Sequence, residues 1–142
     1  MKWVTREGAK TDRVACPWLI TRFIDPEAEF IFAARDQVLP AAARLSGKSF
    51  DAPGGDYTHR GNRCTFEVLI EDFGLRDPAL ARLAHIVHGA DIEGETGTCP
   101  ESAGLLAVAL GFAKTIPDDH EKLRLQFPIY DALYAFCHDA GS

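Results

Sequence analysis

The fold is set by residues 2–33, which read KWVTREGAKTDRVACPWLITRFIDPEAEFIFA. Two short strand-forming runs, Lys2–Arg6 and Ala28–Ala33, flank Val14–Ile24, in which apolar residues recur at helical spacing. This alternation predicts a strand, a helix and a second strand. Because Ala28–Ala33 is mostly apolar, we predict that it is a central strand of the sheet.

Downstream of this stretch the pattern changes from strand to helix. Turn-forming residues and helical periodicity predict a helix, a strand, a brief extended piece and four further helices, with Pro128 kinking or dividing the last. The ranges are 36–45 (interrupted by Pro40), 48–52, 57–59, 66–73, 78–88 (with Gly89 after it), 102–112 and, from Asp118 or Asp119, to 138. The predicted class is α+β, or a small α/β unit, with three to four strands, five to six helices and a helical C-terminal half.

Composition indicates one globular domain over residues 1–142. The chain is 46% hydrophobic and 25% charged, which is close to the globular average and excludes disorder. We see no signal peptide and no apolar run long enough to span a membrane, so we expect no membrane partner, a cytoplasmic protein and reduced cysteines. The oligomeric state is not predicted.

The net charge of −6 is unevenly distributed: residues 1–24 carry +3 and the remainder −9. An acidic body lacks the basic stripe of a nucleic-acid-binding surface. The basic N-terminal part could bind a small anion, although scattered solvated cations explain it as well.

Metal-ligand residue types gather in two segments. In the first, His59 lies in a turn-rich stretch, Cys64 follows, and Glu67 lies in the first turn of the next helix, on the rim of its apolar stripe. In the second, His88 lies near a helix C-terminus and Asp91 in a Gly-rich loop. Each also has a structural explanation, because acids favour helix N-termini, histidines favour C-termini, and Asp forms turns.

These residues predict a site for a divalent transition metal: zinc, iron or manganese. His59, Glu67, His88 and Asp91 form the first rank of ligands, and Cys64 and His120 the second. No HExxH, EF-hand, P-loop or GxSxG pattern is present, so we expect no nucleotide cofactor and no hydrolase triad.

An oxyanion site is predicted where the first helix starts. Free N–H groups at a helix N-terminus, together with Arg6, Lys10 and Arg13, could bind an anion. Cys16 beside Arg13 would then have a lowered pKa, whereas a cysteine buried beside Trp18 would not.

Four segments together resemble the C-terminal domain of the chromate-resistance ChrB family. They are KTDRVACPWLITRFIDP (10–26), HRGNRCTFE (59–67), IVHGAD (86–91) and YDALY (130–134). The resemblance implies a bacterial protein associated with chromate resistance, whose relatives are linked to regulating a chromate exporter. Because the sequence starts at the C-terminal domain of the family's longer form and its body is acidic, we do not expect this chain alone to bind DNA.

Three functional hypotheses follow. The first is a cytoplasmic metal- or oxyanion-responsive module, with chromate as one such small anion. The second is a metal-dependent redox or hydrolytic enzyme that uses the same cleft, with Glu67 or Asp91 as general base. The third is a structural interaction domain in which the polar residues cap helices. The sequence does not decide whether the chain is an enzyme.

Overall fold

A three-stranded parallel sheet lies at one end of the molecule. The computed structural model describes residues 1–92 and 94–140, in which the sheet has the order β2-β1-β3. Strand β1 (Lys2–Arg6) pairs along its length with β2 (Glu29–Ala33) and more briefly with β3 (Lys48–Ser49). Helix α1 (Asp12–Leu19) and a π-helical turn (Ile20–Ile24) connect the first two strands.

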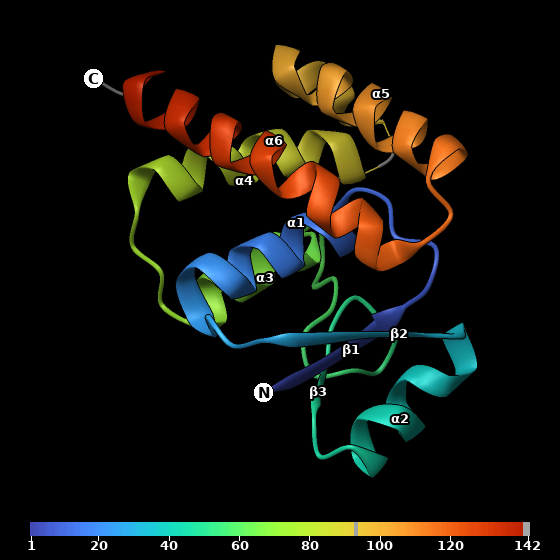
Figure 1. Cartoon of the computed structure of the whole chain (residues 1–142). Coiled ribbons are helices and arrows are strands. Elements are labelled where there is room, and N and C mark those ends of the chain that lie inside the picture. Colours follow the sequence, from blue (N-terminus) through green and yellow to red (C-terminus); the bar gives the residue numbers. More distant parts are fainter. Residues whose placement is uncertain (93, 141–142) are drawn as a thin grey trace.

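The two faces of the sheet pack against different helices, because side chains alternate along each strand. Val4 and Ile31 face α2 (Val38–Arg44) and form a small core with it. Trp3 and Phe30 point the other way, into the main core. Figure 1 shows α2 on one side of the sheet and all the other helices on the opposite side.

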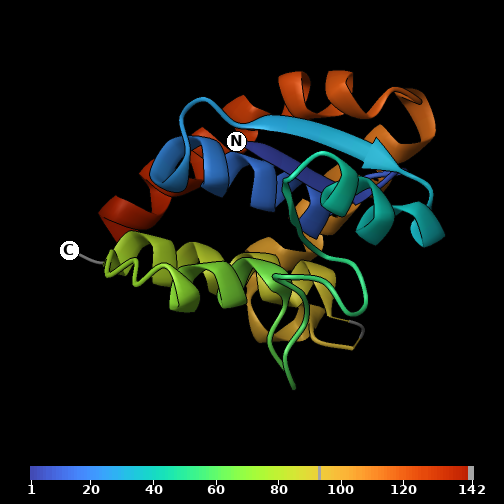
Figure 2. The ribbon, with the colours of Figure 1, turned by 90° about the horizontal axis from the view of Figure 1, so that it is seen from below.

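The C-terminal half is helical, as predicted. It contains α3 (Thr65–Asp72), α4 (Pro78–Asp91), α5 (Pro100–Thr115) and α6 (Asp119–Ala140). Helix α4 packs against α5 and α6, and α6 also packs along α1 (Figures 1 and 2). The α+β class is therefore confirmed, with three strands and six α-helices in the described residues.

The predicted strands lie at the right positions in the sequence, but the predicted central strand and one strand length are wrong. β2 is an edge strand, not the central one, because β1 pairs on both sides. The main core covers only one face of β2, so its side chains are half-buried or exposed. β3 ends at Ser49; the extended piece at Tyr57 forms a single bridge with Phe50.

Two helix predictions are wrong for reasons of packing. Gly89 does not end α4, which continues to Asp91: a Cβ at Gly89 would lie 2.3 Å from Ser102 Oγ, so this glycine allows α4 to approach α5 closely. Pro128 does not divide α6. Its ring is exposed, while Tyr130 is buried in the main core and keeps the helix packed.

Candidate metal centre

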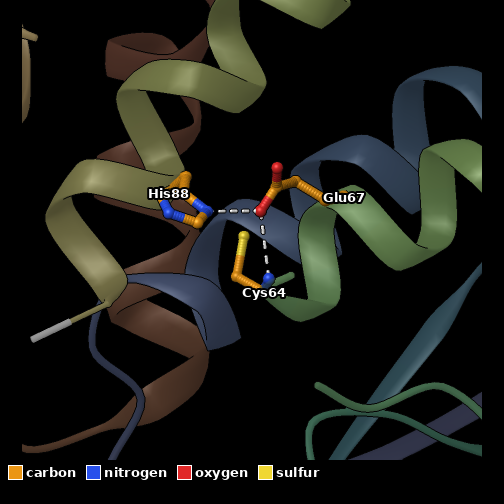
Figure 3. Close-up of side chains that lie close together, drawn as sticks. All are labelled: Cys64, Glu67 and His88. Atoms are coloured by element: carbon orange, nitrogen blue, oxygen red, sulfur yellow. Dashed lines mark hydrogen bonds and ion pairs between the residues drawn. The ribbon is translucent and has the colours of Figure 1, made fainter. Parts of the chain in front are cut away.

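The first group of metal-type ligands, which we name the thiol cluster, consists of Cys64, Glu67 and His88 (Figure 3). One ligand atom from each residue lies within 4.8 Å of the others. Glu67 Oε1 accepts hydrogen bonds from His88 Nδ1, at 2.6 Å, and from the backbone N–H of Cys64, at 3.0 Å. The second bond is half of a capping box, so Glu67 both caps α3 and contacts α4.

Burial and charge shift the pKa values of the thiol cluster in different directions. Burial of the Cys64 side chain, together with the nearby carboxyl of Asp12, raises the pKa of its thiol far above the ordinary value. The hydrogen bonds from His88 and Cys64 hold the pKa of Glu67 below its usual range despite burial, and the same contact raises the pKa of His88. Without a cation the thiol is therefore protonated.

The second group, which we name the carboxylate cluster, consists of Asp12, His59 and Asp91, whose ligand atoms also lie within 4.8 Å of one another. His59 Nε2 lies 2.9 Å from Asp91 Oδ2. Asp12 is buried at the start of α1, and Asp91 is the last residue of α4. Three distant segments therefore meet at this point.

Asp51 fixes the other side of the His59 ring. Its Oδ1 lies 3.2 Å from His59 Nδ1 and accepts a hydrogen bond of 2.9 Å from the Thr65 hydroxyl. Its Oδ2 pairs with Arg13 at 3.3 Å and with Arg6 at 3.5 Å. The hydrogen bond to Asp51 raises the pKa of His59 to about 9, so the ring is doubly protonated at neutral pH.

Crowding of negative charge affects the carboxylates around this ring. Burial raises the pKa of Asp12, and the nearby Asp91 and Asp51 raise it further. Burial and Asp51 likewise raise the pKa of Asp91. Asp12 also accepts hydrogen bonds from Thr65 N at 2.8 Å and Phe66 N at 3.2 Å, so its carboxyl caps α3.

A surface cavity of about 450 Å³ is lined by one residue of the thiol cluster, Glu67. Glu67 forms part of its wall, between α3 and α4. Arg63 and His85 also line it; both are exposed, and His85 points to solvent as its helical position predicts. A small solute could therefore approach Glu67 from outside.

The structure brings five of the six predicted metal ligands together and leaves one apart. His59 meets Asp91, and Glu67 meets His88 and Cys64, so the expected single set is divided into two adjoining clusters. His120 belongs to neither cluster: its ring packs edge-on against Phe32 of β2, with the ring centres 5.1 Å apart.

Two of the predicted oxyanion-binding residues, Arg6 and Arg13, contact a carboxylate of the chain itself. Arg6 and Arg13 pair with Asp51, and Lys10 is exposed. The backbone N–H groups of Gly8 and Ala9, which could bind an anion, donate instead to the Asp119 carboxylate at 2.9 and 2.7 Å.

The structure decides between the two alternatives for Cys16. Helix α1 begins at Asp12, two residues earlier than predicted, so Cys16 lies inside the helix and is fully buried. Its thiol donates to Asp12 Oδ1 at 3.3 Å, and burial beside that carboxyl raises its pKa. The alternative of a buried structural cysteine is confirmed.

The sequence reasoning missed Asp12 and Asp51. Asp12 lies two residues before the first predicted helix and contributes there only to the charge of the N-terminal part. Asp51 has a left-handed backbone conformation, with φ 50°, which is uncommon for a residue other than glycine and places its carboxylate inward. The available signal in the sequence was an acid two residues before the turn-forming Pro53-Gly54.

The donor atoms fit a transition metal by their chemistry. One thiol, two imidazoles and three carboxylates supply sulfur, nitrogen and oxygen ligands of the kinds that zinc, iron and manganese take. In the described residues these two are the groups in which three such side chains converge.

Comparison with known proteins agrees with the family resemblance of the four sequence segments. The family model for the ChrB C-terminal domain matches residues 3–137. The chain belongs to this family. The protein named ChrB from Cupriavidus metallidurans strain CH34 is 40% identical over 134 residues, which cover 94% of this chain and 40% of the relative. This ChrB C-terminal domain therefore spans about two-fifths of the length of the relative that it matches.

Two further results concern the ChrB C-terminal domain as a whole. No solved structure matches the chain. Among the described residues, no helix has the length and apolar character needed to cross a membrane.

Proposed function

We propose that this ChrB C-terminal domain is a cytoplasmic metal-responsive module associated with chromate resistance. Its divalent transition metal is held by Cys64, Glu67 and His88. One observation carries the proposal: a thiol, a carboxylate and an imidazole from two helices converge within 4.8 Å. Family membership, through the relative named ChrB, supports the association with chromate resistance.

The chemistry of the three donors favours zinc or iron. A buried thiol is a poor ligand until its proton leaves, and a coordinated cation removes that proton outright. His88 must likewise give up the proton that it shares with Glu67. Binding therefore releases protons to solvent and replaces a short hydrogen bond by two metal–ligand bonds.

The cavity beside Glu67 supports a response to a small anion. Three protein ligands leave a fourth position of a tetrahedral metal site open. The cavity that Glu67 lines together with Arg63 and His85 would be the approach to that position. Arg63 is paired with Glu71 at the surface and would attract an oxyanion such as chromate only by exchanging that partner.

Elemental analysis of purified protein tests the proposal. We expect one equivalent of metal in the thiol cluster, lost in His88→Ala and in Cys64→Ser and retained in His120→Ala, which removes a histidine outside both clusters. The fluorescence of Trp3 and Trp18, corrected for absorption by the anion, should change when chromate is added to the metal-loaded protein. Absence of metal after incubation with zinc, iron and manganese would leave the structural interaction domain as the better account.

An enzymatic role has one specific observation in its favour. The cavity gives a solute access to Glu67, whose lowered pKa keeps it ionised at neutral pH, as a general base requires. A metal-dependent redox or hydrolytic enzyme would therefore use this same site. In that case Glu67 would act as the base and not as a ligand: turnover of a hydrolysable ester or of chromate that is lost in Glu67→Gln, with the metal retained, would favour the enzyme over the responsive module.

A further inference from the structure

We propose that the domain holds a second divalent cation, bound by Asp12, His59 and Asp91 beside the ion of the thiol cluster. This inference rests on the proposed metal-binding function and deepens it: the site is a pair of ions with different ligand chemistry. The carboxylate cluster supplies an imidazole nitrogen and two carboxylates, within 4.8 Å of one another.

The orientation of His59 is the strongest argument. Histidines that bind metals almost always present one ring nitrogen to the ion and donate the other N–H to a carboxylate. Here Nε2 points into the cluster, toward Asp91, while Nδ1 faces Asp51 at 3.2 Å. Asp51 is not itself one of the three ligands.

Asp51 is held firmly enough to orient the ring. It is 3% exposed, and the Thr65 hydroxyl and Arg13 guanidinium hold its two oxygens. A carboxylate fixed in this way favours one ring orientation and raises the basicity of the nitrogen that faces the ion.

A proton on His59 Nε2 now pairs with Asp91, and a metal ion would take over the position of that proton. Asp12, Asp51 and Asp91 surround a single imidazole, and the two nearby arginines pair with Asp51 alone. Buried carboxylates that lie close together repel each other unless a cation lies between them. An ion between Asp12 and Asp91 would replace the His59 Nε2 proton, which passes to solvent.

The two clusters are mechanically connected. Asp12 accepts hydrogen bonds from Thr65 N and Phe66 N, the two residues that follow Cys64, so a ligand of one cluster supports the helix that carries the other. His88 and Asp91 lie three residues apart on α4, on the same side of the helix. Binding of one ion should therefore position ligands for the next.

The clusters should prefer different metals. Sulfur and nitrogen ligands suit zinc, whereas an oxygen-rich set with one imidazole suits manganese or iron. We expect the thiol cluster to take zinc first and the carboxylate cluster to take manganese.

Equilibrium dialysis of the metal-free domain against cobalt, zinc or manganese, with elemental analysis, tests the inference. Wild-type protein should bind two equivalents of cobalt. His59→Gln and His88→Gln should each bind one, and His120→Ala two. Of these two single-ion variants, only His59→Gln should show the sulfur-to-cobalt charge-transfer band in the near ultraviolet, because its ion is bound by Cys64. Asp91→Asn provides a second variant of the carboxylate cluster, and circular dichroism verifies that each variant is folded.

The outcomes separate the two proposals. One equivalent in the wild type, unchanged in His59→Gln and Asp91→Asn, would overturn the second site and leave the first intact; the His59 contacts would then be an internal ion pair. No bound metal in the wild type would overturn the proposed function as well.

Discussion

The thiol cluster and the carboxylate cluster are neighbours that share helix α4, yet they differ in almost every physical respect. The first contains a protonated, buried thiol and a short bond between Glu67 and His88. The second contains a charged imidazole between carboxylates, with a supporting acid behind it. The difference teaches that one fold can place a sulfur-containing set of donors and an oxygen-rich set about one helical turn apart on α4, which under our proposal are a soft and a hard metal site.

The largest effect is expected for Asp12→Ala, because Asp12 serves both clusters. The substitution removes the acceptor for two backbone N–H groups at the start of α3, which should cost about 2–3 kcal/mol of unfolding free energy. Metal binding should weaken at both clusters. Urea denaturation and metal titration measure the two effects; Asp12→Asn, which retains one acceptor oxygen, is the control and should lose less. Weakening confined to one cluster would refute the proposed link between them.

Asp51→Asn should weaken metal binding in the carboxylate cluster and not in the thiol cluster. Loss of a supporting carboxylate behind a ligating histidine costs about 10–100-fold in metal affinity. We expect this loss for manganese in the carboxylate cluster and little change for zinc in the thiol cluster, as measured by calorimetry. Equal losses for both metals would indicate that Asp51 acts through general stability and not through His59.

Gly89→Ala should affect both clusters equally, because Gly89 lies between His88 and Asp91 on α4. The added methyl group would meet Ser102 Oγ at 2.3 Å and Glu95 O at 3.1 Å, so α4 and α5 must separate slightly. We expect a destabilisation of about 1–2 kcal/mol in thermal denaturation. Exposed Gly111, which has open space around it, supplies the control: Gly111→Ala should leave stability equal or improved.

A smaller effect is expected from pH on the metal-free domain. The pKa of His59 is raised from 6.5 to about 9, so its ion pairs stabilise the fold fully below pH 6.5, and that stabilisation disappears as the pH rises toward 9. Since His59 is substantially exposed, the change should be modest. Unfolding at pH 6, 7.5 and 9 measures it, and His59→Gln should lack this component. An identical pH dependence in the variant would assign the effect to other groups.

The sequence predicted the elements better than their arrangement. Apolar periodicity located β1, β2 and all six helices, because each buries one face. It predicted the wrong central strand, β2 in place of β1, since the order of strands depends on pairing between distant segments. Gly89 was predicted to end the helix because the sequence alone does not distinguish a glycine that terminates a helix from one that lets two helices cross closely.

The candidate site shows the same limit. His59, Cys64, Glu67, His88 and Asp91 were found by residue type, and the structure brings them together in two clusters. Their division depends on contacts over 53 and 32 positions, from Asp12 to Thr65 and from His59 to Asp91, that no local spacing reveals. For the same reason the sequence did not reveal the buried acids Asp12 and Asp51. It predicted that Arg6 and Arg13 bind a small anion, whereas in the structure both pair with the Asp51 carboxylate.

Anomalous diffraction at the zinc edge from crystals of the zinc-loaded domain tests the central claim most directly. We predict a peak about 2.3 Å from Cys64 Sγ and about 2.0–2.2 Å from a His88 nitrogen and a Glu67 oxygen. A fully loaded protein with no anomalous peak among these three side chains would contradict the account.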